Sequence, residues 1–253
     1  MKKQIAAAMA AMALLAGCDD DKESVYSYSM PVSVTMDKMT GKTILLADAD
    51  FYLEPQNLSD FKGIESVVRL YVSFNVSEPI NFEAGKTYKV TLLTSSGSYS
   101  LIPTFGEAID IASEEYKTGG NDSLTVNARE VISMTANGDP YFANGYLNIK
   151  PTFVYLNTVP VYFGAYYDSE SDVVVEGGKA KVTLTLYYST PTQSPLYTTS
   201  SHISIPTPSA IYDQLREAGL TDKDEVTVVV KGKVGMGEPS KSEVLTTVED
   251  FLR

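Results

Sequence analysis

The chain has few of the side chains that most often carry out catalysis. Its 253 residues include one His, one Cys and no Trp. His202, the only imidazole, lies between a Ser/Thr-rich turn and the run 203–205. A general base needs an oriented partner within hydrogen-bond distance, and the sequence identifies none, so we expect His202 to be structural. Because metal and cofactor sites built on several His or Cys ligands are excluded, we predict no metal site and no cofactor.

An acidic segment at residues 168–172 alternates carboxylates in the manner of a calcium-binding loop. An EF-hand loop requires Gly at position six and an acid at position twelve. Counted from Asp168, those positions hold Val173 and Lys179. We therefore expect an acidic hairpin tip, and a weak Ca²⁺ site is the alternative.

Tyrosine is the most suggestive residue type, with 17 copies in the chain. Alternation places Tyr162 and Tyr166 on the strand face opposite Phe163, and Tyr187 ends another strand. Exposed together, such rings could stack on sugars or form a protein interface, because Tyr offers apolar area and a hydroxyl. The candidate ligand-binding residues are therefore Tyr162, Tyr166 and Tyr187. The alternative is that Tyr simply suits half-buried strand surfaces.

The only cysteine, Cys18, follows a segment with the features of a signal peptide. Lys2 and Lys3 precede an apolar run that is too short to span a bilayer, which takes about 20 residues. Residues 15–18, Leu-Ala-Gly-Cys, resemble a bacterial lipobox, so we expect residues 1–17 to be removed and Cys18 to be lipidated. An ordinary secretory peptide with a chance Cys is the alternative.

The chain is acidic, with a formal net charge of −12. Cleavage after Gly17 would remove Lys2 and Lys3, two positive charges, and bring the net charge to −14. Residues 18–29 are predicted to form an acidic tether, and their Asp run also resembles the acidic export signals of Bacteroidetes surface lipoproteins. Because nucleic-acid binding needs clustered Lys and Arg, we predict no nucleic-acid partner.

From residue 30 onward, alternation of period two predicts an all-β fold of short strands separated by Gly, Ser, Asn and Asp turns. The clearest runs are 68–76, 88–92, 147–155, 159–165, 182–186 and 226–230. One short helix is expected near residues 208–218, because Thr207-Pro208 and Gly219 are typical helix boundaries. A domain boundary is expected within 116–123, which has turn residues and no apolar period.

Three stretches together resemble the NigD-like family of Bacteroidetes lipoproteins. They are residues 43–55 (TILLADADFYLEP), 69–76 (RLYVSFNV), and 138–149, which contains GDPY and GYLNI. The resemblance implies an OB-like domain over 30–115, a β-sandwich over 120–253, and no catalytic residues. It also implies a link to bacteriocin immunity. The chain has Asp48-Ala49-Asp50 where the family tends to have Asp-Asp-Gly.

The function expected from these features is that of a lipid-anchored outer-membrane protein and not of an enzyme. It would act as a binding or interaction module with a protein or glycan ligand. A fimbrillin-like structural subunit and a glycan-binding accessory lipoprotein are the alternatives, and a hydrolase is the third. A hydrolase would need paired carboxylates across a cleft, and the sequence singles out no such pair.

Overall fold

The computed structural model describes residues 25–61, 63–93, 99–102, 104, 107–118, 128–129, 140–155, 162–189, 197–232 and 241–252. The predicted signal peptide, Cys18 and the Asp run after it lie outside these residues. The chain divides into two compact units, Met1–Ile102 and Pro103–Arg253. Each unit is described by itself.

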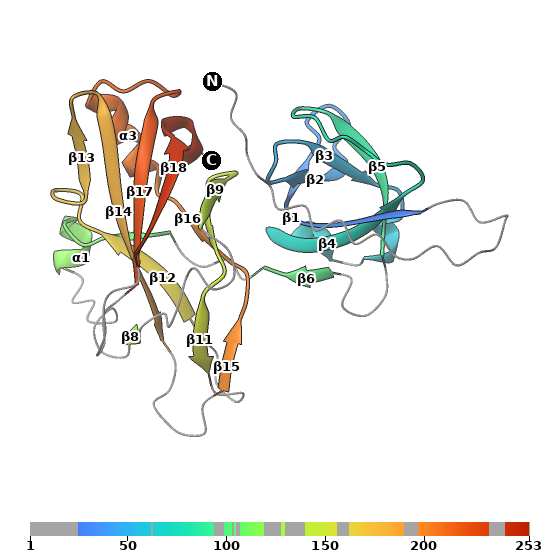
Figure 1. Cartoon of the computed structure of the whole chain (residues 1–253), viewed down its shortest axis with the longest axis horizontal. Coiled ribbons are helices and arrows are strands. Elements are labelled where there is room, and N and C mark those ends of the chain that lie inside the picture. The colour runs from blue at the N-terminus through green and yellow to red at the C-terminus, as the bar shows by residue number, and fades with distance from the viewer. Residues whose placement is uncertain are drawn as a thin grey trace. The chain divides into compact units, whose positions relative to one another are not determined.

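The N-terminal unit is a closed five-stranded barrel (Figure 1). Around the barrel the strand order is β1-β2-β3-β5-β4, and β4 pairs back with β1. Only the β3–β5 pair is parallel. The strands are β1 (Tyr26–Met36), β2 (Thr43–Ala47), β3 (Tyr52–Pro55), β4 (Arg69–Val76) and β5 (Thr87–Leu92), and β6 (Tyr99–Leu101) adds to β4. This closed five-stranded arrangement confirms the predicted OB-like barrel.

Alternating side chains fill the barrel. Leu70, Val72 and Phe74 of β4 point inward and are almost fully buried. Two short 3-10 helices, η1 (Leu58–Asp60) and η2 (Ile64–Ser66), connect β3 to β4. Phe82, from the β4–β5 loop, stacks on Phe51 with ring centroids 4.4 Å apart. The barrel core therefore continues into an aromatic cluster, whose stacked contact is one of the arrangements that aromatic pairs favour.

The larger sheet of the C-terminal unit is mixed. Its order is β18-β17-β14-β12-β7, and β13 and β8 also pair with β14. The central strand β14 is parallel to β17 and antiparallel to β12. The strands are β7 (Ile109–Asp110), β8 (Ala128–Arg129), β12 (Tyr162–Tyr167), β13 (Val173–Glu176), β14 (Lys179–Ser189), β17 (Glu225–Gly232) and β18 (Lys241–Thr247).

The second layer is built from two strand pairs that follow one another. β10 (Tyr146–Ile149) pairs with β16 (Ile203–Pro206), and β11 (Thr152–Tyr155) pairs with β15 (Tyr197–Ser200). The ladder is interrupted at Lys150-Pro151, where Pro151 has no N–H to donate. β9 (Tyr141–Ala143) extends the first pair.

One core joins the two layers of the C-terminal unit. It contains Leu184 and Val228 from the larger sheet, together with Leu147 and Ile205 from the second layer. Packing of two sheets through alternating inward side chains is the arrangement of a β-sandwich. The predicted all-β barrel followed by a sandwich is confirmed.

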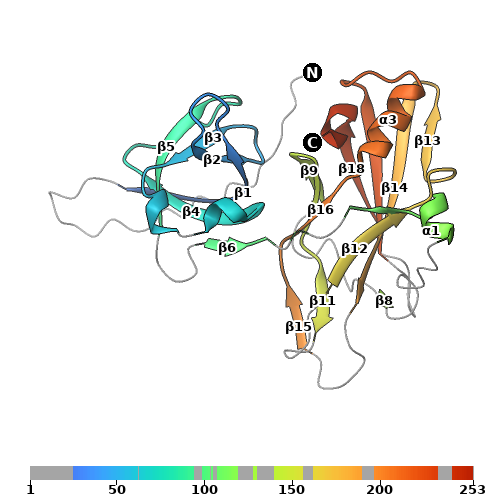
Figure 2. The same ribbon diagram turned by 180° about the vertical axis from the view of Figure 1, so that it is seen from behind.

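The predicted helix is α3 (Ser209–Glu217), which buries Ile211 and Leu215. It contacts the edge strand β13 and the C-terminal 3-10 helix η3 (Val248–Phe251), and both views place it beside β13 (Figures 1 and 2). Helix α3 therefore covers part of a sheet edge, which protects strand groups from pairing with other chains. Thr207 does not cap the helix, because its hydroxyl donates to the carbonyl of Gly145 at 3.0 Å.

Two boundaries differ from the sequence-based expectation. Strand β1 begins at Tyr26, so residues 26–29 belong to the barrel and not to the tether predicted over 18–29. The division between units falls after Ile102 and not within 116–123. The reason is that β7 pairs with β12, and α1 (Glu114–Thr118) follows β7. These elements belong to the C-terminal unit, although β7 and the start of α1 lie within the range 30–115.

Candidate functional site

Two of the three predicted tyrosines meet on the outer face of the larger sheet. In β12, Phe163, Ala165 and Tyr167 point into the core, so Gly164 and Tyr166 face outward. Tyr187 of β14 lies opposite Gly164 in the strand register. The rings of Tyr166 and Tyr187 are tilted by 37° with centroids 6.3 Å apart. The predicted Tyr162 begins β12, but its side chain lies outside the described residues.

A glycine makes room for this tyrosine pair. A Cβ atom on Gly164 would meet the ring of Tyr187, so the ring lies directly over the glycine backbone. An aromatic ring laid over a strand glycine shields backbone that would otherwise be exposed. Burial raises the pKa of the Tyr187 hydroxyl, and the neighbouring Tyr116 of α1 adds to the shift. The ring of Tyr187 therefore packs on Gly164, and both Tyr187 and Tyr166 are half-buried.

The strand register continues this face across two more strands, β17 and β18. Tyr166 is opposite Thr185, Thr185 is opposite Lys231, and Lys231 is opposite Lys241. Residues paired across a ladder project to the same side, so these four side chains form one row. Lys231 and Lys241 are exposed, and Thr185 is half-buried. We call this set, with Tyr187, the tyrosine–lysine face.

One acid lies beside the row. Glu243 accepts from Lys241 at 2.9 Å, and this hydrogen bond and the charge of Lys241 lower the pKa of the Glu243 carboxyl. Lys231 takes part in no such ion pair among the described residues. Sequence reasoning missed both lysines, since they join the tyrosines only through the pairing of β14 with β17 and of β17 with β18. Alternation within a strand predicts which face of the sheet a residue lies on. It does not predict which residues of other strands lie beside it.

The acidic segment 168–172 is not the predicted hairpin tip. It is an insertion between β12 and β13, which both pair with β14, and the hairpin turn itself is Gly177-Gly178. Asp168 accepts from the amide of Glu170, and Asp172 accepts from the amide of Asp168. These carboxylates therefore fold the insertion locally.

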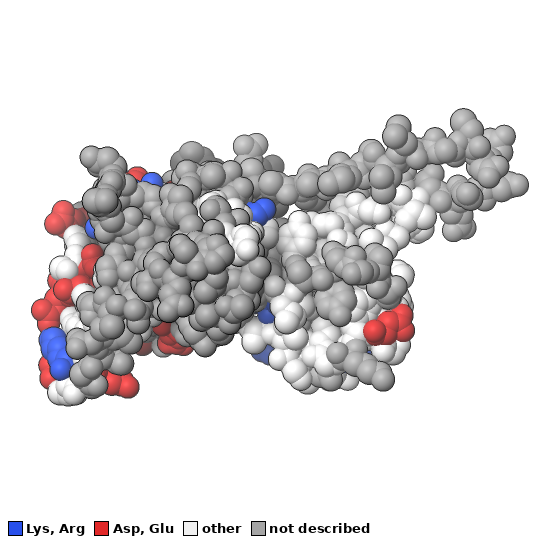
Figure 3. Space-filling model, turned by 90° about the horizontal axis from the view of Figure 1, so that it is seen from below, with Lys and Arg blue, Asp and Glu red and all other residues white. Residues whose placement is uncertain are grey.

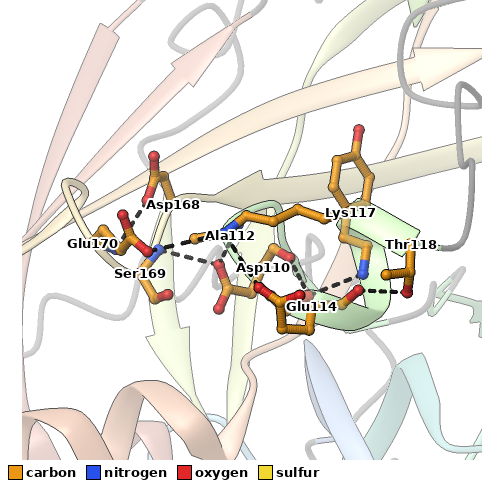
Figure 4. A network of polar contacts seen from close by, with 10 residues as sticks. Asp110, Ala112, Glu114, Lys117, Thr118, Asp168, Ser169 and Glu170 are labelled. Atoms are coloured by element: carbon orange, nitrogen blue, oxygen red, sulfur yellow. Dashed lines mark hydrogen bonds and ion pairs between the residues drawn. The ribbon is translucent and has the colours of Figure 1, made fainter.

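The insertion also holds its surroundings together (Figure 4). The Asp110 carboxylate accepts from the amides of Ala112 and Ser169, at 2.9 and 3.1 Å, and so links β7 to the insertion. Lys117 of α1 lies 4.0 Å from Glu170. Among the residues that the structure describes, no group of three or more His, Cys, Asp or Glu side chains is placed to hold a metal ion. The network therefore holds β7 and α1 against the insertion at 168–172.

His202 immediately precedes β16, as its sequence position suggested. It is half-buried, and its carbonyl accepts from the hydroxyl of Ser201 at 3.4 Å. It therefore lies at a break in the second layer of the sandwich and not on the tyrosine–lysine face.

The first two motifs that carry the NigD-like resemblance meet in the barrel. The guanidinium of Arg69, which is fully buried, donates to both carboxylate oxygens of Asp48 at 2.6 and 2.8 Å. It also donates to the hydroxyl of Ser33 at 2.9 Å. A bidentate pair of this kind fixes the turn after β2 against β1 and β4.

The turn geometry that the sequence left open is resolved at Asp50. This residue has φ 63°, in the left-handed region, and its amide donates to the carbonyl of Ala47 at 3.0 Å. Asp50 thus takes a backbone conformation that glycine adopts most readily, and Asp is among the other residues that tolerate it.

The third motif also has a structural role. Asn144 and Gly145 both have positive φ, and they form a tight turn between β9 and β10. Such Asn-Gly turns match the twist of hairpin strands, a signal that sequence reasoning overlooked. Asn148 then accepts from the buried Ser204 hydroxyl at 2.7 Å across the β10–β16 pair. The motif residues therefore stabilise the fold.

Charge is unevenly distributed over the C-terminal unit. Acidic side chains gather at the left of Figure 3, where this unit lies, and few basic ones lie among them. Acids exceed bases in the whole chain, 32 to 20. In the part of the chain that the structure covers, no helix has the length and apolar character needed to cross a bilayer.

Known structures share this architecture. One is a candidate toxin-related protein from Parabacteroides distasonis, with a TM-score of 0.58 and 13% identity, over 88% of this chain and 95% of that one. Another is a candidate lipoprotein from Bacteroides fragilis, with a TM-score of 0.58 and 15% identity, over 86% and 97%. A third is a NigD-like immunity protein from Bacteroides caccae, with a TM-score of 0.50 and 14% identity, over 85% and 90%.

These likenesses confirm the NigD-like resemblance at the level of the fold. No protein-family model matches the sequence, and no curated protein matches it either. A barrel followed by a sandwich is thus common to this chain and to those Bacteroides and Parabacteroides proteins. Shared folds host unrelated functions, so the role of this chain has to be argued from its own residues.

Proposed function

We propose that the chain is a lipid-anchored cell-envelope protein that acts as a non-enzymatic binding or interaction module. The observation that carries the binding role is the tyrosine–lysine face, where aromatic and cationic side chains share one row across four strands. Tyr and cationic side chains suit recognition because they combine apolar area, hydrogen bonding and charge. The candidate lipoprotein with the same fold supports an envelope location.

The non-enzymatic part rests on the residue inventory. One His and one Cys supply few nucleophiles or bases, and Cys18 is assigned to the lipid anchor. The carboxylates of Asp48 and Asp110 accept hydrogen bonds from other groups of the fold. A general acid or base must be oriented toward a substrate instead.

The anchor is tested by metabolic labelling with an alkyne analogue of palmitate in a Bacteroides host. Wild type should be labelled and Cys18→Ala should not. Ser24→Ala, a change in the same tether, is the matched control and should keep the label. A label retained on Cys18→Ala contradicts the proposal.

We further propose that the anchored protein lies in the outer membrane and is exposed at the cell surface. Protease treatment of intact cells measures it, with Asp19, Asp20 and Asp21 changed together to Ala. If the acidic run is an export signal, this variant should keep its lipid and become resistant to added protease. If the run is only a tether, the variant should be digested like wild type.

Bacteriocin immunity is a further proposal, supported by the name of the Bacteroides caccae protein. Cells that express the chain should then survive a bacteriocin that kills cells expressing Cys18→Ala. Equal killing of both strains by bacteriocins from neighbouring Bacteroides isolates would contradict it.

A further inference from the structure

We propose that the tyrosine–lysine face binds an acidic glycan, with a pyranose ring against Tyr166 and Tyr187 and its anionic group at Lys231. This inference rests on the proposed binding function and names its ligand class. It draws on two properties of the face, which are a preformed aromatic pair and a cationic side chain in the same row across the sheet.

The aromatic end is preorganised. Tyr187 is held over Gly164, and Tyr166 packs beside it with centroids 6.3 Å apart. Because the ring of Tyr187 already packs on Gly164, a ligand would not have to order that ring on binding, which lowers the entropic cost. Tyr166, half-buried on the same face, offers apolar area and a hydroxyl to a sugar.

The cationic end of the face favours a ligand that carries a negative charge. Lys231 lies two strands from Tyr166 in the same row, about 10 Å away at the usual strand spacing. The side chain of Thr185 stands between them and can hydrogen-bond a sugar hydroxyl. This separation suits an oligosaccharide with a ring at one end and a carboxylate or sulfate at the other.

Other charged groups on this face determine which density of negative charge a ligand can have. Lys181 and Lys241 are exposed on the same outer face, and Glu243 is paired with Lys241. A few lysines on a chain of net charge −12 favour a sparsely charged anion. Nucleic acid carries one charge per about 1.7 Å of duplex, a density that needs many more cations. An acidic polysaccharide therefore fits better than a nucleic acid.

The test is affinity electrophoresis of the full mature chain through gels that contain polygalacturonate, hyaluronan or chondroitin sulfate. A neutral galactan gel and single-stranded DNA serve as comparison ligands. We expect retardation by at least one acidic glycan, weakened by added NaCl, with little retardation by galactan or DNA. No retardation by any acidic glycan, or equal retardation by galactan, overturns the inference, as does preferential binding of DNA.

Point variants locate the site. Tyr166→Ala should weaken binding about five- to tenfold, and Tyr166→Phe should retain most of it. Tyr197→Ala, at an exposed tyrosine of β15, is the matched control. Lys231→Glu should weaken binding about threefold or more, whereas Lys223→Glu, in the turn before β17, should not. Equal effects of test and control variants would place binding elsewhere.

Thermal unfolding of every variant, followed by circular dichroism, separates lost binding from lost folding. Tyr166→Ala and Lys231→Glu change outward-facing residues in two different strands, so we expect both variants to fold. If the glycan assay fails while Cys18-dependent labelling succeeds, only this inference fails. If labelling fails while a glycan binds, only the anchor fails.

Discussion

The two units of the chain use their polar and aromatic residues in different ways. In the barrel, Arg69 and Asp48 form a charged pair that links the turn after β2 to β4, and Phe51 and Phe74 contact Phe82 in an aromatic cluster. In the sandwich, a buried polar contact joins two neutral groups, Asn148 and Ser204. The aromatic pair of the sandwich lies on an outer sheet face and not in its core.

This contrast teaches how one chain can separate support from recognition. The barrel is closed, so it leaves no strand edges among its five members. Its motif residues Asp48 and Arg69 hydrogen-bond each other within the barrel. The open mixed sheet of the sandwich can present a row of side chains across strands. We infer that the barrel is the scaffold nearer the anchor in sequence and that the sandwich carries the binding face.

The largest expected effect comes from breaking the barrel's charged pair. Asp48→Ala leaves the Arg69 guanidinium buried without its bidentate partner, which should lower the free energy of unfolding of the barrel by about 3–5 kcal/mol. Urea denaturation measures this. Combining Asp48→Ala with Arg69→Met should recover most of the loss.

The control for that experiment is an exposed pair in the same barrel. Lys42 lies 3.6 Å from Glu54, and its side chain is 67% exposed. Lys42→Ala should change the stability by less than about 1 kcal/mol. If Lys42→Ala and Asp48→Ala had equal effects, the buried pair would not be what holds the barrel.

The next effect is expected in the sandwich at high pH. Burial raises the pKa of Tyr167 to about 12, and the charges of Asp110 and Glu107 add to it. The unfolded chain ionises this tyrosine near pH 10, so its contribution is full below pH 10 and is lost as pH rises through 12. The loss should be about 2–3 kcal/mol.

Denaturation curves measured from about pH 9 to about pH 12 test this expectation for Tyr167. Tyr167→Phe should flatten the decline, because phenylalanine cannot ionise. Tyr197→Phe, at an exposed position, should leave the decline unchanged. Identical pH profiles for Tyr167→Phe and wild type would show that this tyrosine does not drive alkaline unfolding.

A smaller effect is expected from the neutral contact of the sandwich. Asn148→Ala removes the acceptor of the buried Ser204 hydroxyl and should cost about 1–2 kcal/mol. A double-mutant cycle with Ser204→Ala measures the coupling between the two side chains. A coupling well below that of Asp48 with Arg69 would sharpen the contrast between the units, and an equal coupling would remove it.

The smallest effect is expected at Asp50. Gly accepts the left-handed backbone without strain but has a more disordered unfolded state, so Asp50→Gly should change the stability by less than about 1 kcal/mol. Asp50→Val should be destabilising, because a β-branched residue is a poor fit at positive φ. A stability for Asp50→Val equal to that of wild type would contradict the turn geometry. Thermal unfolding measures both variants.

The sequence was sufficient where the signal is local. Alternation in 226–230 identified β17, and Thr207-Pro208 with Gly219 identified α3, because these patterns depend on neighbours along one element. Register between strands is not local. The meeting of Tyr166 with Tyr187 depends on the β12–β14 pairing, and the addition of Lys231 depends on a parallel pairing with β17.

The same limit explains the expectations that were wrong. The segment 168–172 has the composition of a hairpin tip, but its role is fixed by β14, which pairs on both sides of it. The expected domain boundary was placed by turn composition, while pairing of β7 with the distant β12 moved it to Ile102. Long-range pairing overrides local composition in a β protein.

The proposed division of roles between the two units can be measured by hydrogen exchange of the full mature chain, with and without polygalacturonate as the acidic glycan. Protection that the glycan adds to β12, β14 and β17, with none added to the barrel strands, is the predicted result. Added protection in the barrel alone, or in neither unit, would contradict the claim that the sandwich carries the binding face.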